Sequence, residues 1–140
     1  MSKSQSRFSV GSISSPYTND LWKKLLSLWA SDGAFRRAAQ YSLGLADNNP
    51  ELLEFESALA EGDFSVLPPI ELLPASSMAG AKGAYAARTG TIYLNQDWLN
   101  IAREEQIQAV LTEELGHFLD DRINALDTPG DEGELFSTIL

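Results

Sequence analysis

The feature that most constrains the fold is a periodic apolar pattern in the C-terminal part of the chain. Over residues 104–123, apolar side chains recur at the three- and four-residue spacing of an α-helix, which places them along one stripe of its surface. The stripe consists of Ile107, Val110, Leu111, Leu115, Phe118, Leu119 and Ile123. The pattern predicts one long helix that packs through this stripe against the rest of the molecule.

Three shorter helices are predicted nearer the N-terminus. The first follows Asp20, which we expect to be its N-cap, and ends at Gly33. A second helix is expected around residues 35–43. Pro50 is suited to the first turn of a third helix, because its fixed φ is already helical, and Gly62 is expected to stop it.

Short β-structure is predicted between these helices and the long one. Residues 70–73 lie between prolines and form a candidate strand, and residues 84–87 and 91–94 flank a turn signal that is typical of a hairpin. Asn95 can start a short helical turn. The expected class is α+β, with helices packed on a small sheet or hairpin and a long helix near 104–123.

The length of 140 residues indicates one domain. We expect it to span residues 20–140, after a flexible N-terminus at 1–19, with a helical segment at 20–66 and the α+β segment at 67–140. No apolar run approaches the roughly 20 residues that cross a bilayer. The first 20 residues lack the apolar core of a cleavable signal peptide.

Charge and composition restrict the chemistry. The net charge is −10, from 20 acidic and 10 basic residues, which argues against binding to nucleic acids or anionic membranes. The absence of cysteine excludes disulfides, thiolate metal sites and cysteine nucleophiles. Any histidine chemistry must use His117, the single histidine of the chain.

The long predicted helix carries a compact acidic motif, Glu113-Glu114-Leu115-Gly116-His117. Glu113 and His117 are four residues apart, so their side chains lie on the same helical face and can share one ion. Glu114 is rotated by about 100° from Glu113 and is expected to flank that ion. The spacing is that of the H-E-x-x-H motif of zinc peptidases.

With Glu113 in place of the first histidine, the motif resembles the H-E-L-G-H form of zincin-type metallopeptidases. A strand followed by this helix is also typical of that class. Residues 83–140 resemble a domain found near the N-terminus of secreted cyanobacterial proteins that carry hemolysin-type calcium-binding repeats. The resemblance rests on Gly-Ala-Tyr-Ala-Ala, Thr-Ile-Tyr-Leu, Glu-Glu-Leu-Gly-His-Phe-Leu-Asp, Arg-Ile-Asn and Pro-Gly-Asp-Glu-Gly. It implies a metal-dependent peptidase-like domain and an extracellular location.

The resemblance also implies a role for each residue. Glu113 and His117 become metal ligands, and Glu114 becomes the general base that activates water. Glu132 is the expected third ligand, with Asp120 and Asp121 as less favoured candidates. The metal is Zn²⁺ or another divalent cation such as Mn²⁺ or Ca²⁺, because the carboxylate at position 113 makes the donor set harder.

Two alternatives remain open from the residues. The acidic side chains and His117 lie largely opposite the apolar stripe, so they are also explained by a polar helix face exposed to water. The second alternative is a non-catalytic structural or interaction module of a secreted calcium-binding repeat protein, which has kept the scaffold of a peptidase and lost its chemistry. The expected partners are a divalent metal and, for an enzyme, a peptide.

Overall fold

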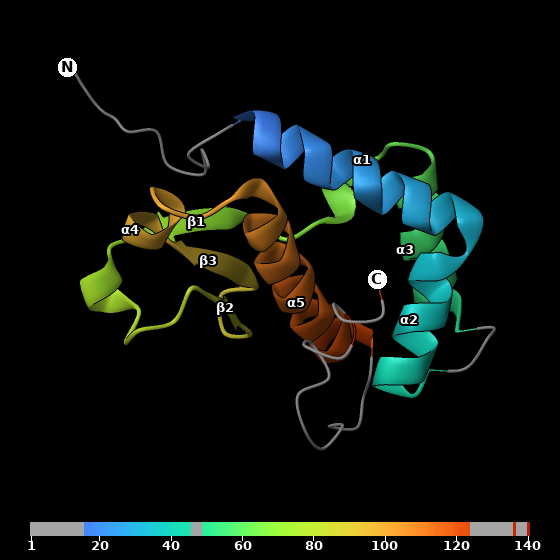
Figure 1. Cartoon of the computed structure of the whole chain (residues 1–140). Helices are drawn as coiled ribbons and strands as arrows, with labels where there is room; N and C mark the ends of the chain where they lie inside the picture. The colour runs from blue at the N-terminus through green and yellow to red at the C-terminus, as the bar shows by residue number, and fades with distance from the viewer. Residues whose placement is uncertain (1–15, 46–48, 124–135, 137–139) are drawn as a thin grey trace.

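Helix α5 (Glu104–Ile123) lies between two layers of the molecule (Figure 1). The computed structural model describes residues 16–45, 49–123, 136 and 140. A small sheet lies on one side of α5 and a group of helices on the other. The other elements are α1 (Pro16–Asp32), α2 (Ala34–Leu43), α3 (Pro50–Ala60), η1 (Phe64–Val66), β1 (Ile70–Leu73), η2 (Ala75–Ser77), β2 (Gly83–Ala86), β3 (Thr91–Asn95) and α4 (Gln96–Leu99).

The helical layer is delimited by local signals. Gly33 adopts φ 85° between α1 and α2, a left-handed conformation that side-chain-bearing residues rarely take. At the start of α3, Oδ1 of Asn49 accepts a hydrogen bond from the backbone N–H of Leu52 at 3.0 Å, and Pro50 follows in the first turn. These signals turn the chain back on itself, so that α1 packs against both α2 and α3.

The sheet has the strand order β1-β3-β2. β1 runs parallel to β3, with Ile70 opposite Ile92, and β2 runs antiparallel to β3, with Gly83 opposite Leu94. Alternate side chains point to the same face of a strand, so Gly83, Ile92 and Leu94 share one face. That face packs on α5, and β2 is left at an edge of the sheet.

The contact between β2 and α5 is close at Gly83. A Cβ atom at this position would lie 2.6 Å from Cγ1 of Val110 and 3.3 Å from Cδ2 of Leu94. No side chain fits in that space without a shift of its neighbours, so a glycine is required here. The close approach brings β2 against the middle of α5.

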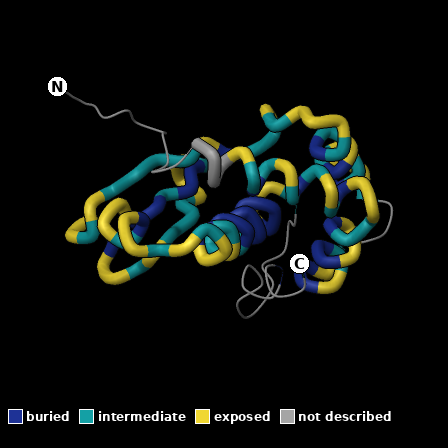
Figure 2. Tube along the Cα trace, turned by 45° about the horizontal axis from the view of Figure 1, so that its top comes forward, coloured by how far each residue is buried: buried dark blue, intermediate teal, exposed yellow. Residues whose placement is uncertain are grey.

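The core joins both layers through α5. Leu111, Leu115 and Leu119 of this helix are fully buried, and Figure 2 shows the buried residues concentrated along its length. Across the interface with α1, the indole nitrogen of Trp22 donates a hydrogen bond to Oγ1 of Thr112 at 3.0 Å. The hydroxyl of Thr112 in turn donates to the carbonyl oxygen of Gln108 at 2.7 Å.

The α+β class and the long helix over 104–123 are confirmed. The strand at 70–73, the hairpin and the helical turn capped by Asn95 are confirmed as well. The prediction that Asp20 caps the first helix is wrong, because α1 begins at Pro16 and Asp20 lies inside it. Proline is favoured in the first helical turn, so the boundary expected between residues 19 and 20 falls within α1.

None of the helices in the described ranges combines the length and the apolar character needed to cross a lipid bilayer.

Candidate metal centre

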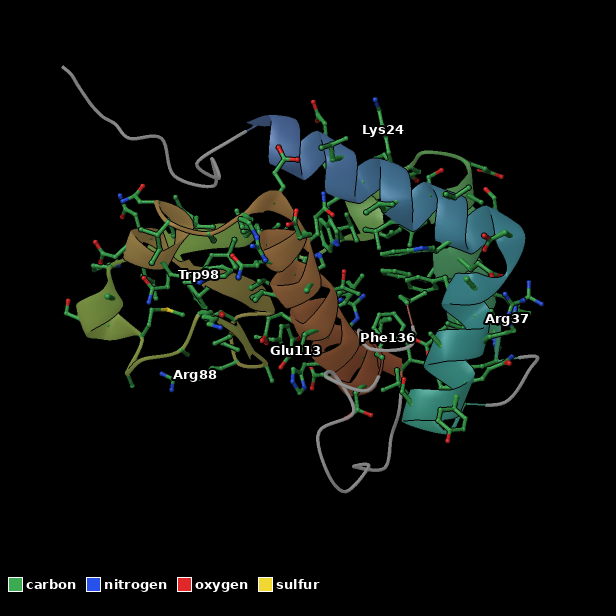
Figure 3. All side chains as sticks on the ribbon, in the orientation of Figure 1. Lys24, Arg37, Arg88, Trp98, Glu113 and Phe136 are labelled. Atoms are coloured by element: carbon green, nitrogen blue, oxygen red, sulfur yellow. The ribbon has the colours of Figure 1, made fainter. Side chains whose placement is uncertain are left out.

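The three residues of the acidic motif that could bind metal come together on α5. A carboxylate oxygen of Glu113, a carboxylate oxygen of Glu114 and a ring nitrogen of His117 all lie within 4.8 Å of one another. The helix itself brings them together, since residues three and four apart are neighbours on its surface. Figure 3 shows Glu113 on α5, on the side where β2 lies in this view.

The surroundings of these groups differ from a solvated helix face. Glu114 retains 7% of its surface exposure and Asp120 retains 8%, whereas Glu113 and His117 are half-buried. The interpretation of the motif as a fully hydrated face therefore does not hold for Glu114 and Asp120. Buried carboxylates require compensating polar contacts, so Glu114 and Asp120 are held by the surrounding fold and not by bulk water.

Strand β2 supplies the opposite wall of this environment. An open hollow of about 440 Å³ lies between β2 and α5. From α5 it is lined by Glu114, His117, Asp120 and Asp121, and from β2 and the following turn by Gly83, Ala84, Tyr85 and Ala87. Two of the three possible metal-binding residues therefore face a space that a small molecule or an extended chain can enter.

Tyr85 and Asp121 connect the two walls of the hollow. The Tyr85 hydroxyl donates a hydrogen bond to Oδ2 of Asp121 at 2.7 Å, and its ring packs edge-on against Phe118. Burial raises the pKa of Tyr85 to about 12, with further contributions from the hydrogen bond to Asp121 and from its negative charge, while Arg122 acts in the opposite direction. The phenol therefore stays protonated at neutral pH, as its hydrogen bond to Asp121 requires.

The structure places the other candidate ligands as follows. Asp120 and Asp121 line the same hollow as His117, but they do not belong to the group of atoms within 4.8 Å. Asp121 is engaged by the Tyr85 hydroxyl. Glu132, the expected third ligand, lies outside the described residues. The geometry thus brings together Glu113, Glu114 and His117.

The donor atoms fit a divalent cation. Two ligands on opposite sides of a Ca²⁺ ion lie about 4.6–5.2 Å apart, because each Ca–O distance is about 2.3–2.6 Å. Zn²⁺ holds oxygen and nitrogen ligands at about 2.0–2.2 Å, so two of its ligands are at most about 4.4 Å apart. Donor atoms within 4.8 Å of one another are therefore compatible with either ion, and this limit does not distinguish between them. Two carboxylates and one imidazole also suit Mn²⁺.

Sequence reasoning did not assign Tyr85 or the β2 edge to the site. Tyr85 lies 36 residues before Asp121, and no periodicity links positions so far apart. The available signal was Gly83, a glycine at the start of a strand, which often marks close approach of another segment.

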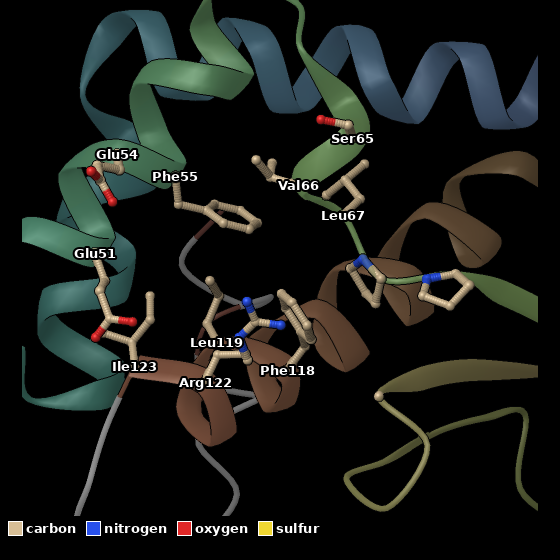
Figure 4. Close-up of a pocket in the computed structure, with 13 residues that line it drawn as sticks. Glu51, Glu54, Phe55, Ser65, Val66, Leu67, Phe118, Leu119, Arg122 and Ile123 are labelled. Atoms are coloured by element: carbon tan, nitrogen blue, oxygen red, sulfur yellow. The ribbon is translucent and has the colours of Figure 1, made fainter.

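A second hollow of about 360 Å³ lies between α3, residues 65–69 and the C-terminal end of α5 (Figure 4). Apolar residues that include Phe55, Val66, Leu67 and Phe118 line it together with the charged residues Glu51, Glu54 and Arg122. Glu113, Glu114 and His117 are not among the residues that line it. It is therefore separate from the candidate metal centre.

Comparisons with protein-family models, with curated proteins and with solved structures gave no match to this chain.

Proposed function

We propose that this chain is a metallopeptidase-like domain that binds a divalent cation through Glu113 and His117, next to Glu114. The observation that supports the proposal is the convergence of one ring nitrogen and two carboxylate oxygens within 4.8 Å. Bound at this site, the cation would polarise a peptide carbonyl and lower the pKa of water. The half-buried position of the two ligands reduces the competition from bulk water for the ion.

The edge of β2 favours a peptide as the substrate. The backbone N–H of Asn95 in β3 donates to the carbonyl of Lys82 at 2.9 Å. Hydrogen-bonded pairs alternate along an antiparallel ladder, so Gly83 and Tyr85 direct their N–H and C=O groups away from β3. An extended peptide can pair with such an edge. It would then lie beside Glu114 and His117, which face the same hollow.

In the catalytic interpretation, Glu113 and His117 hold the cation and Glu114 accepts a proton from the attacking water. Glu114 suits the role of general base by its position, because its carboxylate lies beside the two ligands and faces the hollow. Tyr85 is a positioning residue in this account: it holds Asp121 through its hydroxyl and connects the β2 edge to α5.

One observation favours the non-catalytic alternative. The Glu114 carboxylate belongs to the same donor group as Glu113 and His117. A carboxylate that coordinates the cation is not available as a base, so three-residue coordination predicts a metal-stabilised module without hydrolysis. The two functions therefore differ in what Glu114 does when the cation is bound.

Metal binding is tested by calorimetric titration of chelator-treated protein with Zn²⁺, Mn²⁺ and Ca²⁺. We expect one ion per chain, with binding abolished in His117→Ala and strongly weakened in Glu113→Gln. The matched control is Glu105→Gln, which removes an exposed carboxylate from the same helix. Equal binding by the wild type and by His117→Ala would contradict the proposal.

Hydrolysis is tested separately, by mass spectrometry of a mixed peptide library incubated with the metal-loaded protein. The catalytic interpretation predicts that Glu114→Gln abolishes cleavage while metal binding persists. The non-catalytic alternative predicts no cleavage and weaker metal binding by Glu114→Gln. The variant Glu113→His restores the two-histidine motif, and it should tighten zinc binding and raise any cleavage. If it does neither, the relationship to peptidases is wrong.

A further inference from the structure

A polar hollow lies at the bend between α1 and α2. These helices lie on the far side of α5 from the sheet (Figure 1). Its volume is about 450 Å³. It is lined by the end of α1, by Gly33, by the first turns of α2 and by Glu56 of α3. Arg37 lies at this bend, near the outer surface of the helical layer in Figure 3. Neither β2 nor the candidate metal ligands take part in it.

Glu56 is buried where it lines this hollow, and one of its two carboxylate oxygens accepts hydrogen bonds. The residue keeps 5% of its exposure. Its Oε1 accepts hydrogen bonds from Nε of Arg36 at 2.9 Å and from Nη2 of the same side chain. Its Oε2 has no hydrogen-bond partner, although it is shielded from solvent. A buried carboxylate oxygen without a partner is costly, so this atom indicates a missing donor.

The side-chain amide nitrogen of Gln40 also lacks a hydrogen-bond partner. Within the described ranges, two buried side-chain atoms lack a hydrogen-bond partner, and they are Nε2 of Gln40 and Oε2 of Glu56. Both residues line this one hollow. Buried polar atoms of native proteins are almost always paired. Here one donor and one acceptor without a partner line the same hollow, so a group that both donates and accepts can satisfy both.

The two atoms restrict the chemistry of that ligand. Oε2 of Glu56 needs a hydrogen-bond donor, so the ligand group next to it cannot be a carboxylate or an ionised phosphate oxygen. Nε2 of Gln40 needs an acceptor, so the ligand group next to it cannot be an ammonium. A hydroxyl group satisfies both. The charged residues of the lining balance, with Arg36 and Arg37 against Asp32 and Glu56, so the site has no net charge to attract an ion.

We propose that this hollow binds a small neutral polyhydroxyl compound, a polyol or a monosaccharide, through Gln40 and Glu56. The volume is in the range of small-molecule sites and is more than ten times the roughly 30 Å³ that one water molecule occupies. Arg37, which also lines the hollow, can supply further donors to additional hydroxyl groups. The site is independent of the metal centre, because it is built from α1, α2 and α3.

Nuclear magnetic resonance tests the proposal directly through the side-chain amide of Gln40. We expect titration of metal-free protein with xylitol or glucose to shift the Gln40 side-chain NH₂ signals in a saturable way. Inorganic phosphate and glycine serve as ionic probes, and neither should shift them. Unchanged signals with both polyhydroxyl compounds, as expected for a hollow that holds water only, would overturn the proposal. A saturable response to phosphate or glycine would also overturn it.

The variant Gln40→Met keeps the length of the side chain and removes the donor. We expect its affinity for the same compound to fall roughly three- to tenfold, the effect of one lost hydrogen bond. Binding by this variant is followed by calorimetry, with circular dichroism to verify the fold. The control Gln96→Met changes an exposed glutamine of α4 and should bind like the wild type. Unchanged affinity in Gln40→Met would contradict the assignment of Gln40.

Discussion

The hydroxyl of Tyr85 donates a hydrogen bond to Oδ2 of Asp121 at 2.7 Å, and this contact joins the edge strand β2 to α5 one turn beyond His117. The same ring packs edge-on against Phe118, with centroids 5.7 Å apart. The strand that lines the candidate metal centre is therefore attached to the helix that carries its ligands.

The first prediction concerns the pH dependence of this contact. The pKa of Tyr85 is raised from 10.0 to about 12 by burial and by Asp121. Because the folded value lies above the unfolded one, the contribution of Tyr85 to stability is complete below pH 10 and decreases as the pH rises towards 12. Ultraviolet absorbance of the phenolate, taken as wild type minus Tyr85→Phe, should show a transition near pH 12.

Asp121→Asn provides the control for this titration. It removes the negative charge while burial, the largest cause of the shift, remains. The transition should therefore move part of the way back towards 10. A wild-type transition at the ordinary value for tyrosine would show that Tyr85 is neither buried nor bonded to Asp121.

The second prediction concerns the hydrogen bond between Trp22 and Thr112. Thr112 directly precedes Glu113 in the sequence. Thr112→Val keeps the shape of the side chain and removes the oxygen that accepts from the buried indole N–H. An unsatisfied buried donor costs about 1–3 kcal/mol, and urea denaturation should show a loss of that size. Thr112→Ser retains the hydroxyl and should lose less. Equal losses in both variants would mean that the hydrogen bond contributes nothing.

The third prediction concerns the approach of β2 to α5. Gly83→Ala places a methyl group 2.6 Å from Cγ1 of Val110, and overpacking of this kind costs about 1–3 kcal/mol. The double variant Gly83→Ala/Val110→Ala removes the clashing atom. It should be more stable than the sum of the two single effects indicates. Strict additivity in a double-mutant cycle would contradict the close packing of strand and helix.

Local signals allowed most of the secondary structure to be predicted. The apolar stripe from Ile107 to Ile123 indicated α5, Pro50 indicated the start of α3, and Asn95 indicated the helical turn after β3. Each of these signals acts within a few residues of its effect. The start of α1 was misplaced because both Pro16 and Asp20 can begin a helix, and helix boundaries are the least certain part of such a prediction.

The candidate site was predicted in part. Glu113 and His117 lie four residues apart on one helix, so their proximity follows from helical geometry alone. The burial of Glu114 and the position of β2 depend on tertiary packing, including the space at Gly83, which spacing along the chain does not encode. Glu114 was expected to flank the ion, and its carboxylate lies within 4.8 Å of the other two donors. Its role as a neighbour or as a ligand stays a prediction.

His117 is the central ligand of the proposed metal centre. The chain has a single histidine, so its imidazole signals can be assigned without ambiguity. The decisive measurement is a nuclear magnetic resonance titration of the ¹⁵N-labelled, untagged protein with Zn²⁺, Ca²⁺ and Mn²⁺. We predict that Zn²⁺ or Ca²⁺ shifts the ring nitrogens of His117 at one equivalent. Paramagnetic Mn²⁺ should broaden them, and Glu113→Gln should weaken both effects. Imidazole signals that stay unchanged at saturating concentrations of all three ions would contradict the existence of the metal centre.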